Sequence, residues 1–104
     1  MKIEKEGLLM EFKNPFMNAT IKKFKEIKVD GVNFPLRKFK VISEGKTFSG
    51  EDENIPFPVG KMVKMILEDY KKPGNHVIEM VIKTKEVGEL KFKIEDSTDE
   101  KQGV

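Results

Sequence analysis

Residues 58–70, PVGKMVKMILEDY, decide the fold class that the sequence predicts. Large apolar or aromatic side chains follow Val59 at three, four, seven, eight and eleven positions, a spacing typical of one face of an α-helix. Pro58 suits the first position of a helix, and Pro73-Gly74 suits a point just beyond its end. The sequence therefore predicts one amphipathic helix here.

Alternating apolar and polar residues before and after this stretch predict β-strands. The expected strands lie at about residues 3–13, 21–29, 34–42, 76–84 and 90–95, with a short strand at 47–49 that continues or reverses the third. The second has an uneven apolar spacing, which fits either a bulged strand or a short helical turn. The turn signal Asp30-Gly31 that follows it favours a strand in a hairpin.

The order of three strands, one helix and two strands predicts an α+β fold, either a small antiparallel β-barrel or a strongly curved sheet. This order resembles that of the five-stranded OB barrel, in which the helix lies between strands three and four. The resemblance rests on element order alone, and other small α+β rolls fit the same order. We expect a single domain over residues 1–97 and a disordered acidic tail over residues 98–104.

The composition excludes several classes of protein. The chain has no cysteine and one histidine, so a disulfide scaffold, a thiolate or multi-histidine metal site and a thiol nucleophile are ruled out. It has no apolar run long enough to span a membrane and no signal peptide, so we expect a cytoplasmic protein without a membrane partner. Abundant lysine and scarce glutamine are typical of thermophile proteins, although AT-rich DNA gives a similar bias.

Motifs for catalysis or metal binding are incomplete. Residues 45–47, Gly-Lys-Thr, end like a phosphate-binding loop but lack its earlier glycine, so a hairpin turn is favoured. Residues 51–53, Glu-Asp-Glu, lack the spacing of a calcium loop. His76 has no nucleophile motif beside it and fits a surface or strand-end role. The sequence predicts no catalytic residue, metal ligand or cofactor, although carboxylates can pair in space without a sequence signal.

The net charge of +2 divides into +5 over residues 1–46 and −3 over residues 47–104. The most basic window falls where an OB barrel carries strands two and three, the face that often binds oligonucleotides. We therefore predict a non-catalytic module that binds single-stranded DNA or RNA. The residues expected to contact phosphates are Lys22, Lys23, Lys25, Lys28, Arg37, Lys38 and Lys40, and those expected to stack on bases are Phe16, Phe24 and Phe39.

Other interpretations of the same residues remain open. Phe24 and Phe39 also fit the core of the domain. The acidic loop and tail could meet the basic window of another copy, which would make the chain a protein–protein module or a homo-oligomeric assembly subunit. A small ligand-binding barrel or an enzyme that uses carboxylates or His76 is the third alternative.

Overall fold

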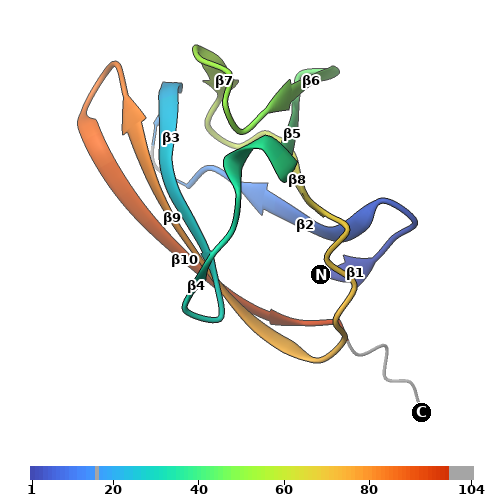
Figure 1. The fold of residues 1–104 in the computed structure, drawn as a ribbon. Helices are drawn as coiled ribbons and strands as arrows, with labels where there is room; N and C mark the ends of the chain where they lie inside the picture. The colour runs from blue at the N-terminus through green and yellow to red at the C-terminus, as the bar shows by residue number, and fades with distance from the viewer. Residues whose placement is uncertain (16, 99–104) are drawn as a thin grey trace.

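The computed structural model describes residues 1–15 and 17–98, and this part of the chain is built almost entirely from β-strands (Figure 1). In chain order the strands are β1 (Lys2–Ile3), β2 (Gly7–Lys13), β3 (Ala19–Val29), β4 (Val32–Asn33), β5 (Phe39–Ser43), β6 (Lys46–Ser49), β7 (Ile55–Phe57), β8 (Met62–Glu68), β9 (Asn75–Thr84) and β10 (Gly88–Ser97). A short 3₁₀ turn, η1 (Leu36–Lys38), leads into β5.

The strands form two antiparallel sheets that enclose one core. The first sheet has the order β1-β2-β8-β5-β6, and the second has the order β10-β9-β3-β4, with β7 paired to the start of β3. Figure 1 shows them as two layers, with β3, β9 and β10 on the left and β2, β5 and β8 on the right. Both sheets are open, so the expected OB-like closed barrel is wrong.

The core lies between the two sheets because central strands such as β8 and β9 alternate side chains buried between the sheets with more exposed ones. Phe39 and Leu67 of the first sheet are 0 % exposed, and Ile27 and Met80 of the second sheet are 1 % exposed. These four belong to one continuous cluster of buried apolar residues. The sandwich is therefore held together by a single apolar layer.

The expected helix at residues 58–70 is wrong, because β8 occupies this segment and the residues described by the structure contain no α-helix. Met65 distinguishes the two patterns. It lies outside the apolar stripe of the helix, but in a strand it shares one face with Val63 and Leu67. Met65 is 1 % exposed, whereas Met62, which the helix would bury, is 49 % exposed. β8 pairs with β2 on one side and β5 on the other, and this long-range pairing overrides the local spacing.

The uneven spacing of residues 21–29 belongs to a bulged strand, as one of the two sequence interpretations predicted. The pairing of β3 with β9 shifts register between Ile21 and Lys23 and again between Phe24 and Glu26. Each bulge inserts one extra residue, so the buried positions fall three apart instead of two before normal alternation resumes. The bulges keep every large apolar side chain of β3 in the core.

Two tight hairpins confirm predicted turns. Asp30 and Gly31, between β3 and β4, have φ values of 52° and 84°, and Glu44 and Gly45, between β5 and β6, have φ values of 52° and 79°. Positive φ at both central residues is typical of the two-residue turns whose twist matches that of paired strands. The residues Gly-Lys-Thr at 45–47 are therefore part of a hairpin.

The two ends of the chain complete the domain. The expected strand at 3–13 is a hairpin of β1 and β2, closed by reciprocal backbone hydrogen bonds between Glu4 and Gly7. Thr98 is 7 % exposed and its backbone N–H donates to the Gly74 carbonyl, while residues 99–104 of the expected tail lie outside the described residues.

Within residues 1–15 and 17–98, no helix has the length and apolar character that crossing a membrane requires.

Candidate functional site

Two of the three aromatic residues expected to stack on bases are buried in the core. Phe24 of the second sheet is 3 % exposed, and Phe39 of the first sheet is 0 % exposed. Their rings meet edge to face with centroids 5.1 Å apart, so their contact joins the two sheets. The third expected residue, Phe16, lies outside the described residues.

The expected basic residues are spread over three elements and are largely paired. Lys22, Lys23, Lys25 and Lys28 belong to β3, Arg37 and Lys38 to η1, and Lys40 to β5 in the other sheet. Four of the seven form ion pairs within the described chain: Lys25 with Glu89 at 3.0 Å, Lys28 with Glu26 at 3.3 Å, Lys38 with Asp69 at 3.3 Å and Lys40 with Glu68 at 3.9 Å. These carboxylates offset most of the positive charge that the sequence count suggested.

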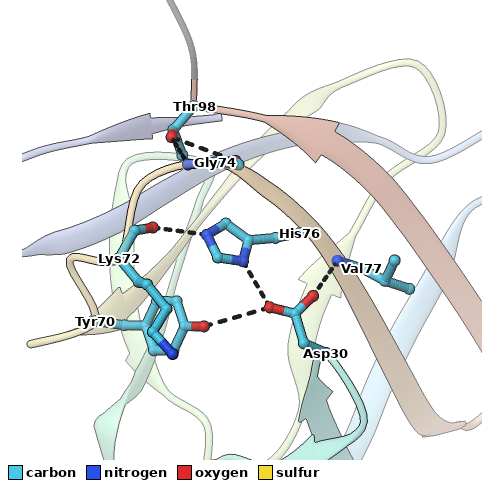
Figure 2. Close-up of polar contacts among 7 residues, drawn as sticks. All are labelled: Asp30, Tyr70, Lys72, Gly74, His76, Val77 and Thr98. Atoms are coloured by element: carbon cyan, nitrogen blue, oxygen red, sulfur yellow. Dashed lines mark hydrogen bonds and ion pairs between the residues drawn. The ribbon is translucent and has the colours of Figure 1, made fainter.

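His76 lies at the start of β9, and both of its ring nitrogens are engaged (Figure 2). Nδ1 lies 2.7 Å from a carboxylate oxygen of Asp30, and Nε2 lies 2.6 Å from the backbone carbonyl of Lys72. Both partners only accept hydrogen bonds, so the ring is the donor in these contacts. With 3 % exposure and no open nitrogen, His76 is placed to hold the structure together.

Asp30 collects the other contacts of this cluster. One oxygen of its carboxylate accepts the hydrogen bond from His76 and lies 3.5 Å from the Tyr70 hydroxyl, and the other accepts the backbone N–H of Val77 at 2.8 Å. The hydrogen bond from His76 and that from Val77 hold the pKa of Asp30 below its ordinary value. Burial and the neighbouring Asp30 carboxylate raise the pKa of Tyr70.

We call this cluster of Asp30, Tyr70, Lys72, His76 and Val77 the histidine clasp. It joins the β3–β4 turn to the start of β9 and to the segment between β8 and β9 (Figure 2). The strand-end position expected for the histidine is therefore correct, but its side chain is buried. The geometry supports a structural role for the clasp.

The acidic residues Glu51, Asp52 and Glu53 form the loop between β6 and β7. The carboxylate of Asp52 accepts the backbone N–H of Ser49 at 2.8 Å, and the Ser49 hydroxyl accepts the backbone N–H of Glu51 at 3.2 Å. These bonds are those of a local turn. In the part of the chain that the structure describes, no three histidine, cysteine, aspartate or glutamate residues are grouped to hold a metal ion.

The feature with the clearest capacity for binding is an apolar surface at one end of the sandwich. Met17, Val59, Met62 and Val87 are among the few large apolar side chains that are more than two-fifths exposed. Met17 and Val87 line one pocket, and we call the surface around this pocket the apolar end. Backbone pairing places Val59 and Met62 beside the end of β2, since Asn14 bridges to Val59 and Lys13 pairs with Met62.

A pocket of about 220 Å³ opens within the apolar end. Its walls come from the β2–β3 loop, β3, β7 and the β9–β10 hairpin: Asn14, Met17, Ala19, Phe57, Val87 and Leu90. Asn14 is 2 % exposed and donates to the carbonyls of Met17 and Phe57 at 2.6 and 2.8 Å. The β9–β10 loop is fixed to β3, since the Glu86 carboxylate accepts the Thr20 N–H at 2.9 Å. The pocket walls are therefore held by hydrogen bonds.

Only part of this site could be predicted from the sequence. Met17 falls between the strands expected at 3–13 and 21–29, where polar residues are usual, and this placement is a signal for a binding surface. Val87 and Leu90 showed no signal, because they follow ordinary hairpin and strand patterns. Met62 was assigned to a buried helix face, so its exposure could not be foreseen.

A comparison with protein families matches almost the whole chain to one family. The family described as "Hydroxymethylglutaryl-CoA reductase, N-terminal domain" matches residues 1–99, a span that contains every strand of both sheets. A comparison with curated proteins gives no match. The family match overturns the prediction that the chain is a nucleic-acid-binding module.

Proposed function

This chain belongs to the hydroxymethylglutaryl-CoA reductase N-terminal domain family, and from that premise we propose that it binds the catalytic part of such a reductase. The name of the family ties the domain to an enzyme that reduces hydroxymethylglutaryl-CoA. A domain linked to an enzyme in this way needs a surface on which the two can meet. The apolar end, with its pocket, is the surface that we assign to this contact.

The observation that carries the proposal is the pair of exposed apolar side chains, Met17 and Val87, that line one apolar pocket. Soluble domains scatter such residues, and a contiguous patch of them usually marks an interaction site. Met17 and Val87 flank the pocket and are 44 % and 47 % exposed. Complete burial of a side chain of this size contributes roughly 1.5–3 kcal/mol, so covering the exposed half contributes about 1 kcal/mol each.

The pocket supplies the specific part of the contact. Its volume of about 220 Å³ can receive one large apolar side chain. Buried anchors of this kind, surrounded by weaker contacts that exclude water, dominate the energetics of protein interfaces. The proposed partner therefore presents a bulky apolar residue to the domain.

A charge placed in the apolar end tests this proposal. We expect Val87→Lys to weaken binding of the purified chain to the catalytic reductase from the same organism by tenfold or more, measured by isothermal titration calorimetry. The matched control is Val32→Lys, because Val32 is 69 % exposed on β4, away from the pocket. Equal affinities for the two variants would contradict the proposal, as would failure of the unmodified chain to bind.

A further inference from the structure

We infer, on the basis of the proposed function, that an extended segment of the reductase adds to the open edge of β10 as a further strand. In this arrangement one apolar side chain of that segment enters the pocket of the apolar end. Main-chain hydrogen bonds to the edge supply affinity, and alternate side chains supply specificity.

The edge of β10 differs from the other sheet edges in length. β10 has ten residues and, among the described residues, pairs only with β9. The other terminal strands of the two sheet orders are β1 and β4, with two residues each, and β6, with four. A long open edge presents a row of backbone N–H and C=O groups that can pair with another chain, and natural proteins usually shorten or cover it.

The pocket lies at the beginning of this edge. Val87 precedes β10 and Leu90 is its third residue, and both line the pocket. At the opposite end the amino group of Met1 contacts the Asp96 carboxylate at 2.8 Å, so the first residue lies against that part of β10. We therefore place the added strand along Gly88 to about Lys93, the part of the edge that is continuous with the apolar end.

The side chains of β10 indicate the chemistry of the added strand. On the core side, Leu90 is half-buried and packs against the core cluster. On the solvent side, Glu89 is paired with Lys25 and Lys93 with Glu95 at 3.2 Å, and Lys91 projects between these two ion pairs. A complementary segment alternates apolar residues, which face the core side, with an acidic residue, which faces Lys91.

The same lysines disfavour a second copy of this chain as the occupant. Antiparallel pairing of β10 with itself centred on Phe92 sets Lys91 opposite Lys93 of the other copy. That register also sets Glu89 opposite Glu95. Like charges directly opposite each other destabilise a strand pair, so this register disfavours self-association through β10.

Amide hydrogen exchange tests the added strand directly. In an antiparallel edge strand, alternate N–H groups bond to the neighbouring strand and the others face solvent. We expect binding of the catalytic reductase to slow exchange at least tenfold at the solvent-facing amides between Gly88 and Lys93, read by nuclear magnetic resonance of the labelled chain. Protection confined to residues 14–19 and 85–87 would overturn this inference and leave the proposed function standing. Absence of binding would overturn both.

Charge reversal gives an independent test. The double variant Lys91→Glu/Lys93→Glu is expected to bind the reductase at least tenfold more weakly at low salt, whereas Lys46→Glu, on the edge strand β6, is expected to bind normally. Retained amide protection of β9 in the free variant shows that the sheet still folds. Normal binding by the double variant, or β10 protection in the free chain through self-association, would overturn the inference.

Discussion

Asp30→Asn is the change that tests the histidine clasp most sharply. The substitution keeps the size of the side chain, and asparagine tolerates the positive φ of 52° at this position. It removes the negative charge that faces His76 at 2.7 Å. It also replaces one acceptor oxygen with an amide group that donates, so either His76 or Val77 loses its acceptor.

The expected cost follows from these contacts. A hydrogen bond to a charged group contributes about 1.5–3 kcal/mol, and we take the lower half of this range because the Asp30 side chain is 40 % exposed. The lost acceptor for the second donor adds about 1 kcal/mol. The free energy of unfolding should therefore fall by about 2–3 kcal/mol. For a domain of this size that corresponds to a decrease in Tm of roughly 10–20 °C.

Urea unfolding followed by circular dichroism measures this cost. Fluorescence of Tyr70 adds a local probe, because the chain has one tyrosine and no tryptophan. The matched control is Asp69→Asn, which also has positive φ, at 64°, and forms an exposed ion pair with Lys38. We expect the control to cost less than about 1 kcal/mol. If Asp30→Asn costs no more than Asp69→Asn, the account of the clasp is refuted.

Two further predictions concern acid stability and the core. The pKa values of Asp30 and Asp96 are lowered in the folded chain, so the stability that they contribute is present above the ordinary aspartate value of about 3.9 and is lost as the pH falls towards their folded values. A series of urea midpoints from pH 7 to pH 3 should therefore fall, and it should fall less for Asp30→Asn; an equal fall would contradict the assignment. Met65→Ala should lower the free energy of unfolding by about 2–5 kcal/mol and Met62→Ala by less than about 1 kcal/mol. A larger loss for Met62→Ala than for Met65→Ala would contradict strand β8 and favour a helix at residues 58–70.

Local sequence patterns predicted the β9–β10 hairpin and the turn after β3 correctly. The alternation in β9 and β10 and the turn at Asp30-Gly31 are set by neighbouring residues, and the structure confirms them. The bulges of β3 were one of two interpretations, the other being a short helical turn. Both fit, because apolar residues spaced first three and then two positions apart occur in either structure. These features were accessible because each depends on a few consecutive residues.

The error at residues 58–70 has a physical cause. A short apolar run fits helical and strand periods alike, and the burial of Met65 and the exposure of Met62 separate them here. The deciding contribution is the pairing of β8 with β2 and β5, which are distant in sequence. The same limit applies to the apolar end, since four separate segments build its pocket.

Site-directed photo-crosslinking shows which surface of the domain meets the reductase. A benzophenone amino acid replaces Met17 in one variant and Val32 in the other, and each is irradiated with the catalytic reductase. We predict a covalent adduct with the reductase from position 17 and none from position 32. An adduct from position 32 alone, or equal yields from both positions, would contradict the account.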